Sequence, residues 1–151
     1  MSREIVNQLD LELASIVRSL KELVNSVPQN LLYENNVAEN ILRSAAAIEQ
    51  TCGGLTANLW DDPFEWTLPE TLSNADRIIE YLSEVDLARQ RAFNSILDDS
   101  ALGKYISVPS GEPKLLISLL LETLVTAADH RGRALSEAKI LFSQGAQGFI
   151  I

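Results

Sequence analysis

Apolar residues recur at intervals of three and four along four separate segments of this chain, which is the pattern of helices that each bury one face. In the first segment, from Arg3 to Val27, they are Ile5, Leu9, Leu13, Ile16, Val17, Leu20, Leu23, Val24 and Val27. Pro28 closes this helix, because proline disfavours helical geometry in the residue before it. The chain is therefore expected to fold as packed helices.

The second helix is expected to follow two good N-cap residues, Asn35 and Asn36. Its apolar positions are Val37, Ile41, Ala45, Ile48, Cys52 and Leu55. We expect Gly53 and Gly54 to fray or end it, because each glycine costs about 1 kcal/mol relative to alanine inside a helix.

The third helix can be capped by Thr71, Ser73 or Asn74. Its apolar stripe comprises Leu72, Ala75, Ile78, Ile79, Leu82, Val85, Ala88, Ala92, Phe93, Ile96 and Leu97. Charged residues, among them Asp86 and Arg89, occupy the other positions, and a solvated face accounts for them. The fourth helix is expected from Leu115 to Phe142, apolar at its start and polar later.

Two long connections precede the third and fourth helices. The first holds Trp60, Phe64 and Trp66, which we expect to plug the open end of a helical bundle rather than stack on a ligand, because such rings gain most from burial. The second, residues 98–114, contains a stretch at 105–108 that is expected to be extended. The fold class predicted is all-α, an antiparallel four-helix bundle in one domain covering residues 1–151.

The charge balance limits the partners of this chain. Lys and Arg number 12 against 21 for Asp and Glu, a net charge of -9, and the sequence has no basic stripe that would attract a phosphate backbone. It contains neither an export signal nor an apolar run long enough to cross a membrane. The lone Cys52 cannot form an internal disulfide, which suits a reducing compartment. We expect a cytoplasmic protein without nucleic-acid or membrane partners.

The fourth helix carries one polar column that is suited to chemistry. Glu122, Thr126 and His130 stand at successive i, i+4 positions, with Arg133 and Glu137 prolonging the column, and we expect it to face the bundle interior or a cleft. Glu122 lies about 12 Å along the axis from the only histidine, too far to share a metal ion with it. For His130, a histidine held by hydrogen bonds in or near the core is favoured over acid or base catalysis, because neighbouring Asp129 points to another face.

Cys52 is predicted to be a small buried core residue rather than a nucleophile. A nucleophilic thiol needs a cation or a helix N-terminus to lower its pKa, and Cys52 stands near a helix end among apolar neighbours.

His130-Arg131-Gly132-Arg133 is similar to the His-Arg-Gly-Gln signature of the DinB-like superfamily, the DinB/YfiT type of bacterial four-helix bundles. The stretch from Tyr105 to Gly111 before the last helix supports the resemblance. It implies a homodimer and a zinc or nickel ion held by three histidines, one on the second helix and an i, i+4 pair on the fourth. Members that keep this site include thiol S-transferases and a thiol-dependent isomerase.

Carried onto this sequence, the resemblance places His130 at the last ligand position and Thr126 at the one before it. The ligand of the second helix falls near Arg43 or Ser44, so two of the three histidines are missing and an arginine there would repel a cation. The resemblance thus implies a degenerate metal site, with no metal cofactor and a persisting cleft lined by Arg43, Ser44, Thr126 and His130.

Three functional hypotheses follow. The first is a metal-free module that binds a small ligand or another protein and forms a homodimer. Its ligand would be a small anion bound by Arg43 and His130. The alternative is a thiol-dependent transferase or isomerase that holds zinc or nickel through His130 with Glu122 or Asp129. The third is a subunit of a larger complex that makes contact through the aromatic loop or the apolar tail at residues 149–151.

Overall fold

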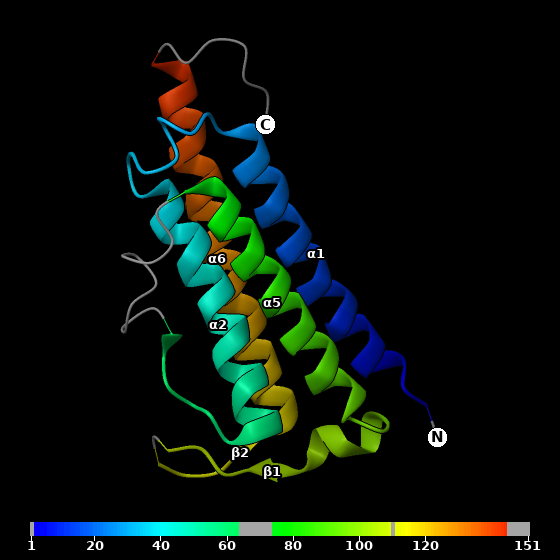
Figure 1. Ribbon diagram of the computed structural model, residues 1–151. Helices are drawn as coiled ribbons and strands as arrows, with labels where there is room; N and C mark the ends of the chain where they lie inside the picture. Colours follow the sequence, from blue (N-terminus) through cyan, green and yellow to red (C-terminus); the bar gives the residue numbers. More distant parts are fainter. Residues whose placement is uncertain (1, 64–73, 110, 145–151) are drawn as a thin grey trace.

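Four long helices and a small hairpin make up the computed structural model, which describes residues 2–63, 74–109 and 111–144 (Figure 1). The all-α class predicted from the sequence is confirmed. The helices are α1 (Glu4–Ser26), α2 (Val37–Ala57), α5 (Ala75–Asn94) and α6 (Leu116–Ser143). A short 3-10 helix, η1 (Asp99–Gly103), leads into strands β1 (Tyr105–Ile106) and β2 (Lys114–Leu115). No helix of the described residues is both long and apolar enough to span a membrane.

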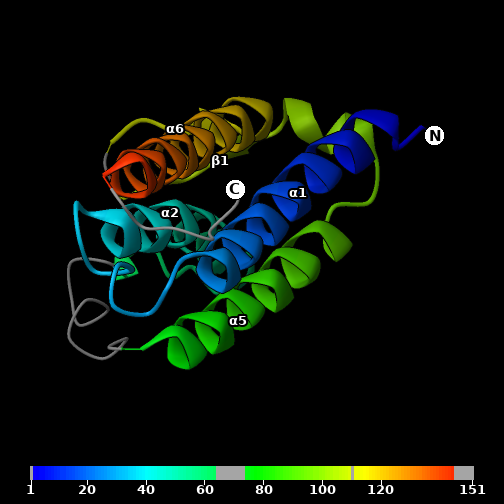
Figure 2. The ribbon, with the colours of Figure 1, turned by 90° about the horizontal axis from the view of Figure 1, so that it is seen from above.

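The helices form a bundle in which each packs on two neighbours. α2 packs on α6 and α5, and α1 packs on α5 and α6, so that α1 and α2 lie across a diagonal (Figure 2). α1 and α6 run in one direction, and α2 and α5 run in the other (Figure 1). The α2–α6 pair, which carries the predicted site residues, is therefore an antiparallel pair in direct contact.

The predicted apolar stripes form the core, with two exceptions. Of the nine apolar positions expected to face inward on the first helix, all but Ile5 are buried. In the third stripe Leu97 is 83% exposed, because α5 ends at Asn94 and Leu97 lies in the loop beyond it. Cys52 is buried at 1% exposure, as predicted.

Both asparagines expected to cap α2 have another conformation. Asn35 and Asn36 take left-handed backbone angles, with φ of 48° and 64°, and the Asn36 side chain makes no capping hydrogen bond. At the start of α5 the prediction holds for Asn74, whose side chain accepts from the amide of Arg77 at 2.9 Å. The other predicted caps, Thr71 and Ser73, lie outside the described residues together with Leu72.

α2 continues through Gly53 and Gly54 to Ala57, where the sequence predicted an end or fraying. A Cβ on Gly54 would lie 2.2 Å from the indole ring of Trp60, so the glycine provides room for that ring. Asn58, in the left-handed conformation, ends the helix and reverses the chain so that Trp60 returns onto α2. Close approach, rather than helix breaking, is the role of Gly54.

Arg3, directly before α1, caps the end of α5, and Asp99 of η1 caps the start of α1. Arg3 donates to the main-chain oxygens of Phe93 and Ile96 at 2.5 and 3.1 Å. Asp99 in turn accepts from the amides of residues 5 and 6 at 3.2 and 2.9 Å. A guanidinium at a C-terminus and a carboxylate at an N-terminus satisfy backbone groups that have no partner within their own helix.

The predicted extended stretch at 105–108 forms a strand only at its first two residues. Tyr105 pairs with Leu115 and Ile106 with Lys114 in the antiparallel hairpin. Val108, at the end of this stretch, and Pro109 after it line a cavity with residues of α2 and α6. The hairpin thus covers one end of the α2–α6 pair and brings Lys114 to it.

Candidate functional site

Two cavities open along α2 and α6, and the predicted site residues are divided between them. One, of about 480 Å³, is called here the His130 cleft and is lined by Asn36, Glu39, Asn40, Arg43, His130, Arg133, Ser136 and Glu137. The other, of about 290 Å³, is called the Trp60 cavity and is lined by Ala47, Gln50, Thr51, Trp60, Val108, Pro109, Lys114, Leu119, Glu122, Thr123 and Thr126.

The four residues expected to share one cleft do not all meet. Arg43 and His130 line the His130 cleft, whereas Thr126 lines the Trp60 cavity. Ser44 is fully buried and donates its hydroxyl hydrogen to the main-chain oxygen of Ala127 at 2.6 Å. It therefore joins α2 to α6 instead of facing a ligand. Of the other candidates, Arg133 lies in the His130 cleft and Glu122 in the Trp60 cavity.

His130 is held by a side chain from α2. Its Nδ1 lies 3.1 Å from Oδ1 of Asn40, and because an amide oxygen only accepts, Nδ1 carries the hydrogen of this bond. Nε2 is then the unprotonated nitrogen of the neutral ring. The bond fixes both the tautomer and the orientation of the imidazole.

The charges around His130 are nearly balanced. Arg43 lies 3.6 Å from Glu39 on α2, and Arg133 lies 3.1 Å from Asp129 on α6. Burial lowers the pKa of His130 below its usual range; Asp129 opposes this shift, while the arginines at 133 and 43 add to it. The imidazole is therefore uncharged at neutral pH, beside two guanidinium groups.

A metal site is not formed by the described part of the chain. Among residues 2–63, 74–109 and 111–144, no three His, Cys, Asp or Glu side chains are grouped so that they could hold an ion. Glu122, proposed above as a substitute ligand, pairs instead with Lys114 at 2.7 Å. Asp129, the other proposed substitute, pairs with Arg133.

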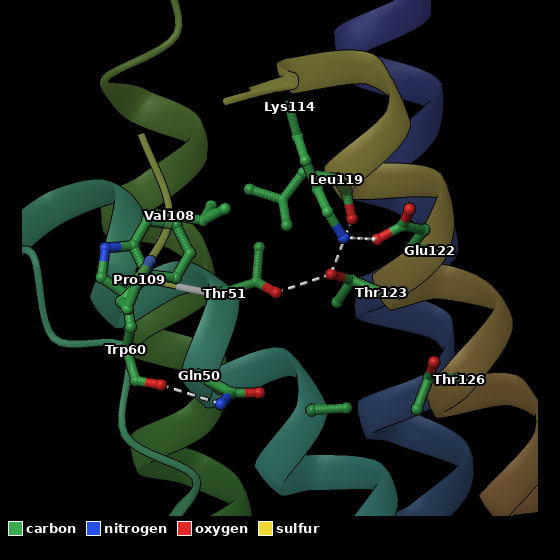
Figure 3. Close-up of a pocket in the computed structure, with 11 residues that line it drawn as sticks. Gln50, Thr51, Trp60, Val108, Pro109, Lys114, Leu119, Glu122, Thr123 and Thr126 are labelled. Carbon is green, nitrogen blue, oxygen red and sulfur yellow. Dashed lines mark hydrogen bonds and ion pairs between the residues drawn. The ribbon is translucent and has the colours of Figure 1, made fainter. Parts of the chain in front are cut away.

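The Trp60 cavity has a fixed aromatic wall (Figure 3). The Trp60 indole covers Gly54 and donates its Nε1 hydrogen to Oδ1 of Asn58 at 2.8 Å. The main-chain oxygen of Trp60 accepts from Nε2 of Gln50 at 2.8 Å. The sequence placed this residue in a plug of the bundle end; Phe64 and Trp66, its predicted companions, lie outside the described residues.

Two buried threonines close the bottom of this cavity. Thr123 donates to the main-chain oxygen of Leu119 at 2.8 Å, and the Thr51 and Thr123 hydroxyl oxygens are 2.6 Å apart. Because the hydrogen of Thr123 is already used, Thr51 is the donor between them. The pair joins α2 to α6 in the same way as the Ser44 hydroxyl does nearer the start of α2.

Sequence reasoning missed Gln50, Thr51 and Lys114 as cavity residues. No pattern within a helix marks Thr51, and Lys114 reaches the cavity only because β1 pairs with β2. The glycine pair at 53 and 54 was the available signal, since a glycine inside a helix often marks the close approach of another group.

A second polar cluster lies between α1 and α5, where Asp86 and Arg89 border a cavity of about 340 Å³. Arg89, expected on a solvated face, is 8% exposed and forms ion pairs with Asp10 of α1 and Asp86 of α5.

Burial raises the pKa of Cys52 to about 12, although the positive charge of Arg89 opposes the shift. A thiol with this pKa is inert at neutral pH, in agreement with the structural role predicted for Cys52.

Comparisons with known proteins returned no match to a family model, to a curated protein or to a solved structure.

Proposed function

We propose that this protein is a small-ligand-binding module that holds a small anion in the His130 cleft. The observation that supports the proposal is that Arg43 of α2 and His130 and Arg133 of α6 line the same cleft. Planar guanidinium groups recognise carboxylate and phosphate groups, and the imidazole becomes a further donor when Nε2 is protonated. The volume of about 480 Å³ accommodates a small organic acid.

The acidic residues of the cleft determine what kind of anion it can take. The Arg43–Glu39 and Arg133–Asp129 pairs are at least 41% exposed, and such pairs are worth only about 0–1 kcal/mol. An anion can therefore replace these carboxylates as the partner of either guanidinium. Glu39 and Glu137 remain in the lining and repel a polyanion, so the proposal is a ligand with one anionic group.

Binding of an anion is expected to be coupled to protonation of His130. In the free protein its pKa is lowered, first by burial, and a bound negative charge favours the protonated ring. Affinity should therefore rise as the pH falls from 7.5 to about 6, near the ordinary histidine pKa of about 6.5.

The single histidine allows a direct test. The imidazole Hε1 resonance of His130 is followed by NMR while inorganic phosphate or acetate is added across this pH range. We expect a saturable shift and a higher His130 pKa with anion bound, both lost in Arg43→Gln. Arg91→Gln, which changes an exposed arginine of α5, is the matched control and should behave as wild type. A resonance that neither anion moves would refute the proposal.

The enzyme alternative and the proposed family make separate predictions. About one equivalent of zinc or nickel in untagged protein purified without chelator, and lost in His130→Ala, would replace anion binding by metal-dependent thiol chemistry. Membership of the DinB-like superfamily and the homodimer associated with it remain predictions, and sedimentation of the purified protein tests the second of them.

A further inference from the structure

The Trp60 cavity contains a pair of opposite charges that has no role in the function proposed above. Nζ of Lys114 lies 2.7 Å from Oε2 of Glu122, and both side chains line the cavity (Figure 3). The two side chains are 39% and 56% exposed. A pair this open contributes at most about 1 kcal/mol, so a ligand that supplies its own charges can separate it at little cost.

The aromatic part of the wall is organised before any ligand binds. Trp60 is positioned by the absence of a side chain at Gly54 and by hydrogen bonds with Asn58 and Gln50. A flat ring already fixed in place gives up little conformational entropy when an apolar group packs against it. Val108, Pro109 and Leu119 extend the apolar lining.

The remaining polar groups and the size of the cavity narrow the ligand class. Thr51 and Thr123 already bond to one another and to Leu119, so the strongest polar sites are the ammonium of Lys114 and the carboxylate of Glu122. The volume of about 290 Å³ is at the small end of the range of about 300–1,000 Å³ found for ligand pockets. It suits a molecule of amino-acid size better than a nucleotide.

We propose that the Trp60 cavity binds a free α-amino acid with an apolar side chain. The carboxylate of the ligand pairs with Lys114, its ammonium group pairs with Glu122, and its side chain packs against Trp60. A simple anion would leave Glu122 without a partner, and a simple cation would leave Lys114 without one. A zwitterion replaces one ion pair by two and leaves the net charge of the site unchanged. This inference does not depend on anion binding in the His130 cleft.

The test is isothermal titration calorimetry at pH 7.5 with L-phenylalanine and L-leucine as probes. We expect saturable binding of at least one of them with a stoichiometry of one per chain. Two derivatives of L-phenylalanine remove one charge each: the N-acetyl derivative lacks the ammonium group, and the amide lacks the carboxylate. Both should bind at least about tenfold more weakly, the effect expected for loss of a charge-assisted hydrogen bond.

Variants locate the site. Lys114→Met and Glu122→Gln should each weaken binding of the better probe by at least about tenfold. Both should fold normally, because the two side chains are 39% and 56% exposed. Arg91→Gln, which changes an exposed arginine of α5, is the matched control and should leave this affinity unchanged. The proposal is overturned if neither probe binds saturably, if the singly charged derivatives bind as well as the zwitterion, or if both cavity variants keep wild-type affinity.

Discussion

The two sides of this bundle use polar residues in opposite ways. Between α1 and α5, Arg89 is 8% exposed and forms ion pairs with Asp10 and Asp86, although Asp86 and Arg89 also border a cavity of about 340 Å³. Between α2 and α6, neutral hydroxyl groups join the helices at Ser44 and Thr51, while the ion pairs at the two cavities are at least 39% exposed. Breaking a mostly buried ion pair destabilises the fold, whereas an exposed pair can be exchanged for a ligand at little cost.

The largest expected effect concerns the Arg89 ion pairs between α1 and α5. Arg89→Met leaves two carboxylates without their cationic partner, so we expect the free energy of unfolding to fall by about 2–3 kcal/mol, somewhat less than the about 3–5 kcal/mol of a fully buried pair because both aspartates are partly exposed. Urea denaturation followed by circular dichroism measures it. Arg91→Met on the exposed face of α5 should change stability by less than about 0.5 kcal/mol. Equal losses of stability in the two variants would contradict a stabilising role of the Arg89 ion pairs.

Removing the hydroxyl links between α2 and α6 should lower the free energy of unfolding by less than Arg89→Met does, and by different amounts for the two threonines. Thr123→Val leaves the buried Thr51 hydroxyl without its acceptor, at a cost of about 2 kcal/mol, whereas Thr51→Val removes only one bond and should cost about 1 kcal/mol. The order follows from the direction of the hydrogen bonds, in which Thr51 donates to Thr123. The same denaturation experiment measures both, and a greater loss in Thr51→Val would show that the direction is reversed.

Two glycines on the facing helices offer a matched pair with effects near 1 kcal/mol. Gly132 of α6 has open space where a Cβ would lie, so Gly132→Ala should stabilise the protein by up to about 1 kcal/mol through helix propensity. In Gly54→Ala the new Cβ collides with Trp60, and the same gain should be cancelled or reversed. Equal stabilisation by both changes would contradict the packing of Trp60 on α2.

The smallest expected effect concerns pH. Because the pKa of folded His130 lies below its usual value, the folded state binds fewer protons than the unfolded chain as the pH falls. The neutral ring contributes stability above about pH 6.5, and this contribution is lost as the pH falls through the folded pKa. Wild type should therefore lose stability relative to His130→Gln between pH 7.5 and pH 5, measured by urea denaturation. A difference independent of pH would show that His130 does not titrate abnormally.

The sequence predicted most of the buried residues, because burial in this bundle follows helical periodicity. The spacing of Leu9, Leu13 and Leu20 determines which face of α1 is buried, and Cys52 was correctly placed in the core. Arg89 was not foreseen, because an arginine on a helix is solvated unless a neighbouring helix presents a carboxylate at the same height. That height depends on how α1 is positioned along α5, and no local pattern encodes it.

The candidate site was foreseen only in part, for a similar reason. Arg43 and His130 line one cleft because α2 and α6 are neighbours, which the family resemblance implied. Thr126, one turn before His130, lies instead in the cavity that Val108, Pro109 and Lys114 also line. Which cavity a residue between α2 and α6 faces depends on where the β1–β2 hairpin and Trp60 pack, and the helical pattern of α6 encodes neither position.

The exchange of caps between Arg3 and Asp99 has a consequence for how the molecule opens. The first turn of α1 is completed by a carboxylate more than ninety residues away along the chain, and the end of α5 is completed by Arg3. Fraying of the start of α1 removes Arg3 from the end of α5, and opening of the segment that follows α5 removes Asp99 of η1 from the start of α1. The amide hydrogens of Ile5 and Val6 should therefore exchange with solvent slowly for residues so near a chain terminus, and together with the amides of α5.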